Sequence, residues 1–222
     1  MTNREVVSII RSKLKQISGD DIISDRAILA ELKSTANLYI KREVDRRRLL
    51  TVDSLFTTIS CLEMVEVPLS ECCSYTSPCT IRRTKYKLPK LGEGVWGYIV
   101  ETVQSMDGSM RFSEGTASRY VNLLNLRKSP NKNIFWMQNG YLYVSNSDIE
   151  TVMMRAYFEE DVPFELISCD PDALDEECKN PLDQPFRCPG YILQNVISTV
   201  EGVYANIFMR VKEDVTDDDK EN

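Results

Sequence analysis

The chain has 222 residues and contains no histidine. Imidazole is the base in Ser-His-Asp triads and Cys-His pairs and a ligand in HExxH zinc sites and zinc deaminases, so these centres are excluded. The sequence has no run of about 18 apolar residues, and its first residues lack the pattern of a signal peptide. We therefore expect a chain made in the cytoplasm, with no membrane partner.

Paired C-x₂₋₄-C spacing, which is typical of structural zinc sites, is also missing. The chain has an odd number of irregularly spaced cysteines and no secretion signal, so we expect reduced thiols and no bound metal. Cysteine catalysis has no histidine to support it. The seven cysteines are Cys61, Cys72, Cys73, Cys79, Cys169, Cys178 and Cys188.

The charge of the chain is strongly polarised along the sequence. The net charge is −7 overall, but it is +4 over residues 1–50, +1 over residues 51–158 and −12 over residues 159–222. A basic beginning and an acidic end can attract the opposite ends of neighbouring copies, or a charged partner.

Two amphipathic helices are predicted at the start of the chain. Thr2 and Glu5 have capping-box spacing ahead of an apolar stripe that extends to residue 17. Ser24 is the predicted N-cap of a second helix, which runs from about Asp25 to Leu50. Its stripe comprises Ile28, Leu29, Leu32, Ala36, Tyr39, Ile40 and Val44.

From residue 55 onward the pattern is typical of β-strands. Asn139-Gly140, between two apolar runs, predicts a type I′ hairpin in which Met137 pairs with Leu142 and Trp136 with Tyr143. Strands are also predicted at 55–67, 81–88, 95–103 and 151–158, and residues 111–126 are ambiguous with a hint of a short helix. Residues 159–189 form an acidic loop rich in proline.

A terminal helix is predicted from Pro189-Gly190, with proline in its first turn. Its broad apolar face comprises Ile192, Leu193, Val196, Ile197, Val200, Val203, Tyr204, Ile207 and Phe208. This face needs partners, and the two N-terminal helices are the natural ones.

The predicted fold class is therefore α+β, with a helical bundle from the N-terminal helices and the C-terminal helix, and an inserted β-rich domain. The expected organisation is a helical bundle over residues 1–54 and 186–212 and a β-rich inserted domain with an acidic loop over residues 55–185. Residues 213–222 are expected to form a disordered acidic tail.

Residues 92–97, Gly-Glu-Gly-Val-Trp-Gly, match the phosphate-binding pattern G-x-G-x-x-G. In a dinucleotide-binding fold a helix follows this motif, whereas here a strand is predicted. A kinase loop needs a lysine on the next strand, and no lysine occurs between Lys90 and Lys128. We expect a turn that enters a strand, and no cofactor. The acidic run at 170–177 lacks the glycine and closing glutamate of an EF-hand, so a solvated loop is expected there.

The basic segment 41–48 contains Arg42, Arg46, Arg47 and Arg48 at the end of the second predicted helix. Interleaved Glu43 and Asp45 dilute its charge, and the isoelectric point of the chain is about 4.9. An ionic protein interface is favoured. The alternative is a small regulatory or nucleic-acid-binding module that uses Arg42–Arg48.

Four stretches of this sequence resemble the virion neck proteins of crAss-like bacteriophages, which are head-to-tail connector or ring adaptor proteins. They are SDRAILAELKSTANLYIKREVDRRRLL, LFTTISCLEMVEVPLSECC, NIFWMQNGYLYVS and PFRCPGYILQNVISTVEGVY. The resemblance extends over nearly the whole chain and is loosest at 104–132 and 168–183. It carries no catalytic signature.

The resemblance implies a non-enzymatic structural subunit in the neck of the virion. Such adaptors form a ring, usually twelvefold, that docks on the portal and surrounds the DNA exit channel, through which DNA passes without specific binding. The implied partners are further copies of the chain, the portal protein and other neck or tail proteins. The candidate interface residues are Arg42, Arg46, Arg47, Arg48, Glu213, Asp214, Asp217, Asp218 and Asp219.

Overall fold

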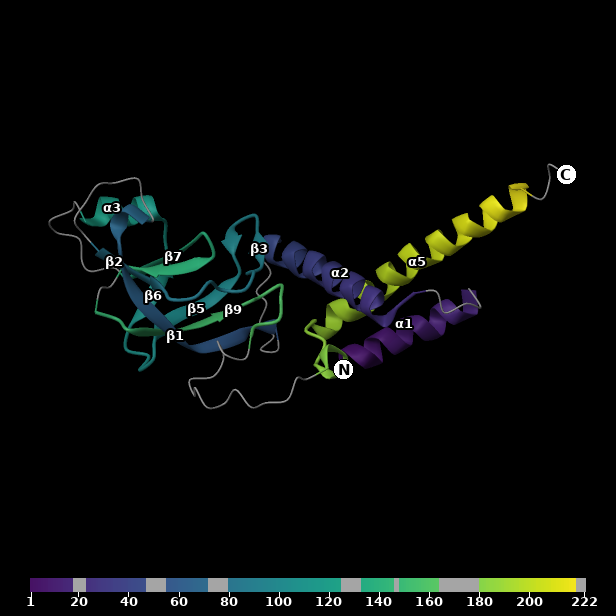
Figure 1. The fold of residues 1–222 in the computed structure, drawn as a ribbon, viewed down its shortest axis with the longest axis horizontal. Helices are drawn as coiled ribbons and strands as arrows, with labels where there is room; N and C mark the ends of the chain where they lie inside the picture. The colour runs from purple at the N-terminus through teal and green to yellow at the C-terminus, as the bar shows by residue number, and fades with distance from the viewer. Residues whose placement is uncertain are drawn as a thin grey trace. The chain divides into compact units, whose positions relative to one another are not determined.

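The computed structural model describes residues 1–17, 23–46, 55–71, 80–124, 133–145, 148–163 and 180–218. The fold is mixed α+β and divides into two compact units (Figure 1). The helical unit comprises Met1–Leu55 together with Glu176–Asn222, and the barrel unit comprises Phe56–Asp175. The barrel unit is therefore inserted between two segments that belong to the helical unit.

The helical unit contains three α-helices and one short 3₁₀ helix among its described residues: α1 (Asn3–Ile17), α2 (Asp25–Asp45), η4 (Pro181–Asp183) and α5 (Gly190–Asp218). Both predicted N-terminal caps are confirmed. The amide of Thr2 donates to Glu5 at 2.9 Å, and the amide of Glu5 donates to the hydroxyl of Thr2 at 3.3 Å. The amide of Ala27 donates to the hydroxyl of Ser24 at 3.2 Å.

The three helices contact one another through their apolar stripes. The buried side chains recur at helical spacing on each helix, so each contributes one apolar face. These side chains are Val6, Val7, Ile10 and Leu14 of α1, Ile28, Leu29, Leu32, Ala36 and Ile40 of α2, and Ile192, Val196, Ile197 and Val200 of α5.

The ends of the helices differ from those that the sequence predicted. Helix α2 ends at Asp45, with Arg46 as its C-cap, and the expected extension over residues 47–50 lies outside the described residues. Helix α5 continues past residue 212, the predicted end of the helical bundle, to Asp218. Its first turn begins at Gly190, and the carbonyl of Pro189 accepts from the amides of Ile192 and Leu193. Pro189 therefore precedes the first turn.

The chain returns to the helical unit earlier than the predicted boundary at residue 186. The 3₁₀ helix η4 packs on α1, where the side chain of Asn3 donates to the carbonyl of Pro181 at 2.7 Å. Arg4 also forms an ion pair with Asp183 at 2.9 Å. These contacts attach residues 181–183 to the helices, and the boundary accordingly falls between Asp175 and Glu176.

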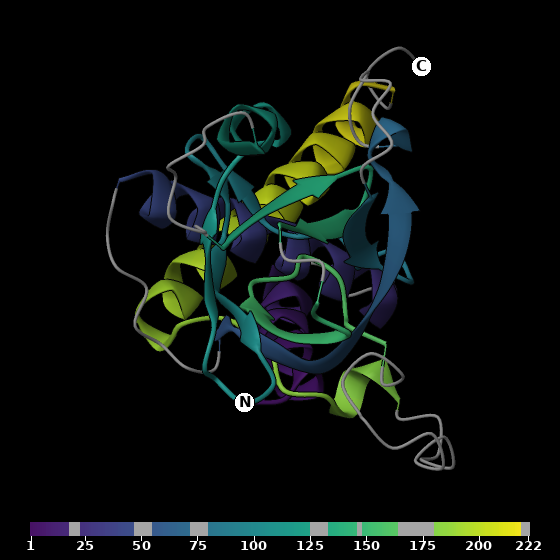
Figure 2. The ribbon, with the colours of Figure 1, turned by 90° about the vertical axis from the view of Figure 1, so that its left-hand side faces the viewer.

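Seven strands close into a barrel in the order β1-β2-β8-β7-β6-β5-β9. All neighbouring pairs are antiparallel except β6 and β7, which are parallel. In Figure 2 the strands surround the barrel interior. The strands are β1 (Thr57–Pro68), β2 (Thr80–Thr84), β5 (Val100–Ser105), β6 (Arg111–Glu114), β7 (Ile134–Gln138), β8 (Tyr141–Val144) and β9 (Thr151–Ala156).

A separate two-stranded hairpin consists of β3 (Glu93–Gly94) and β4 (Gly97–Tyr98). The ambiguous stretch 111–126 resolves into β6 followed by the short helix α3 (Ala117–Leu124). A 3₁₀ turn, η2 (Leu69–Glu71), follows β1.

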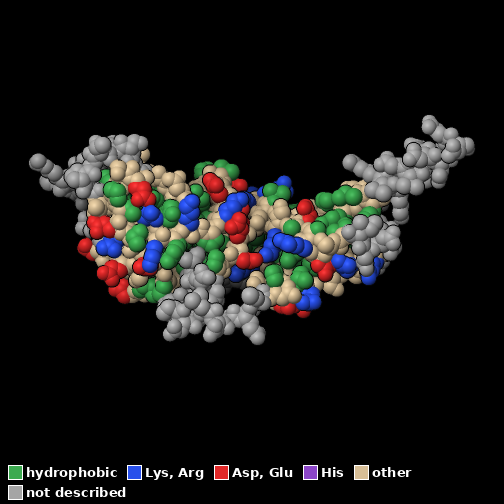
Figure 3. All heavy atoms as spheres, in the orientation of Figure 1, with side chains coloured by type: hydrophobic (Ala, Val, Ile, Leu, Met, Phe, Trp, Pro, Cys, Tyr) green, Lys and Arg blue, Asp and Glu red, His purple; other side chains and the backbone are tan. Residues whose placement is uncertain are grey.

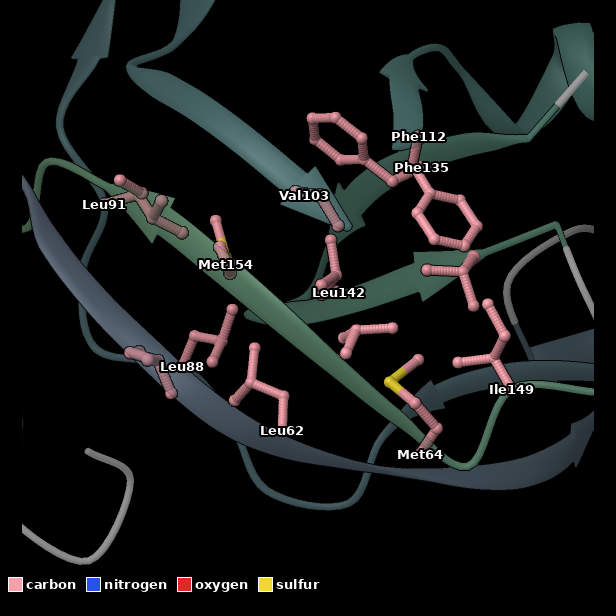
Figure 4. Close-up of a cluster of buried hydrophobic side chains, with 14 of the residues drawn as sticks. Leu62, Met64, Leu88, Leu91, Val103, Phe112, Phe135, Leu142, Ile149 and Met154 are labelled. Carbon is pink, nitrogen blue, oxygen red and sulfur yellow. The ribbon is translucent and has the colours of Figure 1, made fainter. Parts of the chain in front are cut away.

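The side chains of the barrel alternate between two hydrophobic clusters, because successive residues of a strand point to opposite faces. Phe135, Leu142 and Val144 belong to the interior cluster, where Figure 4 shows side chains from several strands converging. Trp136 and Tyr143 belong to a second cluster together with Tyr120 of α3. The centroids of the Trp136 and Tyr143 rings lie 5.7 Å apart, with the rings nearly parallel.

The predicted Asn139-Gly140 hairpin is confirmed. Asn139 has φ of 54° and Gly140 has φ of 82°, as a type I′ turn requires. The observed register pairs Met137 with Leu142 and Trp136 with Tyr143, as expected.

The expectation that all seven cysteines are reduced is wrong at Cys61, which is disulfide-bonded. Its partner lies outside the described residues. Disulfide formation depends on which cysteines the fold brings within about 4.5 Å between their Cβ atoms, and neither an odd count nor irregular spacing reports that distance. Cys188 is a free thiol.

Candidate subunit interface

The basic end of α2 presents two of the predicted interface residues. Arg42 is exposed, and its guanidinium lies 5.8 Å from the centroid of the Tyr39 ring. Arg46 forms an ion pair with Glu43 at 3.3 Å, although its side chain remains 63% exposed. Glu43 therefore lowers the local charge but does not cover the guanidinium. Arg47 and Arg48 lie outside the described residues.

The acidic residues lie at the far end of α5. Glu213, Asp214, Asp217 and Asp218 are all on the helical backbone, because α5 extends to Asp218. Asp219 lies outside the described residues. The predicted disordered tail is therefore wrong for residues 213–218, which continue the helix.

Side-chain contacts show that α2 and α5 run antiparallel. The hydroxyls of Tyr39 and Thr199 lie 2.9 Å apart. Further along α5, burial and the charge of Glu31 both raise the pKa of Tyr204, which places the earlier part of α2 beside the later part of α5. Lys13 of α1 forms an ion pair with Glu201.

This arrangement separates the two charged groups. Arg46 follows Tyr39 toward one end of the helical unit, while Asp214 follows Thr199 toward the other. At 1.5 Å per residue, the separation along the helices is roughly 30 Å. That distance is about three to four Debye lengths at physiological ionic strength, so the basic end of α2 and the acidic end of α5 cannot pair within one copy.

A second surface on α5 is apolar. Val203 and Ile207 belong to the predicted apolar face of this helix, but they are 40% and 49% exposed. Among the side chains described on α5, the last buried one is Val200. Figure 1 shows α5 continuing past the ends of α1 and α2, and Figure 3 shows hydrophobic side chains along the exposed part of this helix. The expectation that the helical core buries the whole stripe is therefore wrong for these two residues.

The third exposed surface is the motif at residues 92–97, which forms the β3–β4 hairpin. The predicted turn is confirmed, and no helix follows the glycines; Val100 begins the barrel strand β5. Val95 and Trp96 at the tip are 79% and 63% exposed. Sequence reasoning missed this surface because it weighed the glycines and not the large residues between them. The available signal was the pair Val-Trp at a position where turns favour small or polar residues.

The described residues offer little for a small ligand. A cavity of about 240 Å³ lies between α1, α2 and η4 and is lined by Arg4, Val7, Ser8, Arg11, Asp25 and Leu182. Both guanidiniums at this cavity are ion-paired, Arg4 with Asp183 and Arg11 with Asp25. Within the described residues, no group of three or more Cys, Asp or Glu side chains has an arrangement that could hold a metal ion.

The described part of the chain also contains no helix that is both long enough and apolar enough to cross a bilayer. Among the residues whose side chains are described, the exposed features include the basic end of α2, the apolar face of α5 and the aromatic hairpin tip. Surfaces of these kinds are typical of protein–protein contacts.

Comparison with known families gives the class of the protein. Residues 5–222 match the CrAss ring 2 model, described as phage tail ring protein 2. The chain belongs to this family of ring proteins of crAss-like phages, which confirms the resemblance inferred from the sequence. The chain is thus a tail or neck ring protein and part of a virion. No curated protein matches it.

Proposed function

We propose that this chain is a structural, non-enzymatic subunit of the head-to-tail connector in the phage neck. In this proposal twelve copies form a ring that docks on the portal and surrounds the DNA exit channel, and DNA passes without specific binding. The three helices form the bundle by which each copy contacts its neighbours and the portal. Other neck or tail proteins contact the remaining surface.

The observation that carries this proposal is the placement of opposite charges at opposite ends of the helical unit. The basic end with Arg42 and Arg46 and the acidic end with Asp214 and Asp218 are too far apart to neutralise each other within one copy. Two different, complementary patches on one chain support a heterologous contact, and such contacts close into rings when the rotation between copies allows it. The family match supports the same assembly.

The alternative role as a nucleic-acid-binding module gains no support. Glu43 already pairs with Arg46, and Arg42 lies beside an aromatic ring. Contacts to phosphate dominate nonspecific binding to DNA. The nearby acidic residues repel phosphate and so weaken such binding further.

Assembly of the purified full-length chain tests the proposal. We expect ring-shaped particles by negative-stain microscopy and a single large species by light scattering. Replacement of both Arg42 and Arg46 by Glu should weaken assembly at low salt. The control is Arg119→Glu, which makes the same type of change at an exposed residue of α3. A wild-type chain that stays monomeric at all concentrations and salt conditions, with no ring in the virion, would contradict the proposal.

Docking on the portal is tested by deletion of residues 213–222. This deletion removes the acidic end and leaves every described buried side chain of α5 in place. We expect an unchanged fold. Assembly of copies should weaken, because the acidic partner of Arg42 and Arg46 is lost, and portal binding should weaken as well, most clearly at low salt, where charges are least screened. Equal portal binding by the full-length and shortened chains at low salt would show that the acidic end only increases solubility.

A further inference from the structure

The β3–β4 hairpin is held firmly at its base. The amide of Gly92 donates to the carbonyl of Tyr157 at 2.9 Å, and the amide of Tyr157 donates to the carbonyl of Ile99 at 3.0 Å. The amide of Ile99 closes the hairpin on the carbonyl of Gly92 at 2.9 Å. Gly97 has φ of 125°, which a residue with a side chain rarely adopts. The turn is therefore presented in a fixed conformation.

The tip of this hairpin has an unusual composition for a two-residue turn. Gly, Asn, Asp and Ser normally occupy such turns, whereas Val95 and Trp96 occupy this one. Contact with water is unfavourable for exposed apolar side chains of this size, and their burial on association is favourable. Tryptophan is also among the residues that contribute most to protein interfaces. A rigid hairpin with Trp96 at its tip loses little conformational entropy on binding.

The helical unit carries a face that matches this tip. Val203 and Ile207 are one helical turn apart on α5, so their exposed side chains lie on the same face. Gly202 precedes Val203 on the adjoining side of the helix, and a Cβ placed there would meet nothing within 4 Å in the same copy. The helix surface next to Val203 is therefore open in the same copy.

We propose that the Val95–Trp96 tip of one copy packs on the Val203–Ile207 face of α5 in the neighbouring copy. This inference rests on the proposed ring function, because a ring needs two different patches on each chain. The hairpin belongs to the barrel unit and the helix face belongs to the helical unit, so the contact is heterologous. Neighbouring copies would then be joined by this apolar contact in addition to the ionic contact between their helix ends.

Charge favours a second copy over nucleic acid as the occupant. The exposed carboxylate of Glu93 borders the tip, and the carboxylate of Glu114 lies at Gly97, where a Cβ would meet its Oε1 at 3.1 Å. Burial raises the pKa of Glu114. A phosphate backbone would face carboxylates here, whereas the exposed part of α5 offers an apolar surface.

Site-specific crosslinking tests this contact directly. Trp96 is replaced by p-benzoylphenylalanine in the full-length chain, and copies with and without heavy-nitrogen labelling are mixed before assembly. We expect mixed-isotope crosslinks between residue 96 and residues 199–211 of another copy. Assembled rings whose crosslinks map elsewhere, or only within one copy, would overturn this inference and leave the ring function standing. A wild-type chain without rings or intermolecular crosslinks would contradict both.

Variants add a quantitative test. We expect Trp96→Ala and Ile207→Ala each to weaken association of copies at least tenfold, with a double variant no weaker than the stronger single one. The matched control is Tyr86→Ala, because Tyr86 is an aromatic residue of the barrel unit that is 60% exposed. Its effect should be small and additive with that of Ile207→Ala. Circular dichroism checks that each variant folds. Additive effects of Trp96→Ala and Ile207→Ala would contradict the contact.

Discussion

The hydroxyl of Tyr39 donates a hydrogen bond to the hydroxyl of Thr199 and thereby joins α2 to α5. The two oxygens are 2.9 Å apart, and the single proton of Thr199 is already donated to the carbonyl of Asn195 at 2.8 Å. Tyr39 must therefore be the donor in this pair. This bond fixes the register in which the basic end of α2 and the acidic end of α5 point in opposite directions.

We predict that Tyr39→Phe destabilises the helical unit by about 0.5–1 kcal/mol, since the bond is partly exposed. Thr199→Val should cost a similar amount. A double-mutant cycle in urea should show coupling between the two changes, because each removes one end of the same bond. Fully additive effects would show that the bond does not contribute to stability.

Two glycines should respond to alanine in opposite ways. A Cβ at Gly92 would lie 2.3 Å from Cδ1 of the buried Tyr157, so Gly92→Ala should lower the free energy of unfolding by about 1–3 kcal/mol. Gly202 is helical with open space around it, and Gly202→Ala should stabilise α5 by up to about 1 kcal/mol. Chemical unfolding of the dissociated chain measures both. A destabilising Gly202→Ala under those conditions would contradict the assigned helix.

Asp107 should titrate at unusually low pH. Its carboxylate accepts hydrogen bonds from the hydroxyl of Ser105 at 2.5 Å and from the hydroxyl and amide of Ser109 at 2.8 and 3.1 Å. These bonds lower its pKa from 3.8 to about 2. A lowered pKa means that the ionised form stabilises the turn above pH 3.8, and this contribution is lost as the pH falls through about 2.

Carboxyl-carbon NMR of the folded chain measures this titration. Ser109→Ala should move the midpoint of Asp107 back toward its ordinary value, because one hydroxyl donor is removed. A wild-type midpoint near 3.8 would contradict the hydrogen-bonded turn.

Cys188 should be a slow nucleophile. Burial raises the pKa of its thiol from 9.0 to about 11, and the sulfur lies 3.7 Å from the carbonyl of Pro189. The thiolate fraction at pH 8 is then roughly a hundredfold below that of an ordinary cysteine. Alkylation by iodoacetamide, followed by peptide mass spectrometry, should show slow modification in the folded chain and fast modification in urea. Equal rates in the two conditions would show that the thiol is not shielded.

Local signals predicted the parts of the fold that depend on neighbouring residues. The box formed by Thr2 and Glu5, the cap at Ser24 and the Asn139-Gly140 turn each need only a few consecutive residues, and all three are present. The closed order of seven strands and the parallel pairing of β6 with β7 depend on contacts far apart in the sequence, which periodicity does not report. The disulfide at Cys61 escaped prediction for the same reason.

The candidate interface was predicted only in part. Charge counting found the basic end at Arg42 and Arg46 and the acidic end of α5, because charge is visible in sequence. It did not show that the two ends point apart. The exposure of Val203 and Ile207 was hidden, since their spacing is the same as that of the buried residues before them. The position along α5 at which its apolar side chains become exposed depends on the lengths of α1 and α2, which bury the earlier part of the helix.

The closure of the barrel between β1 and β9 has a consequence for assembly. Among the described strands, the closed wall leaves none at an open edge of the sheet, so another copy cannot extend the barrel by strand addition. Many copies crowded into one particle therefore have no route through this barrel to an open-ended fibril. Any contact that another copy makes with the described barrel strands is therefore made through side chains.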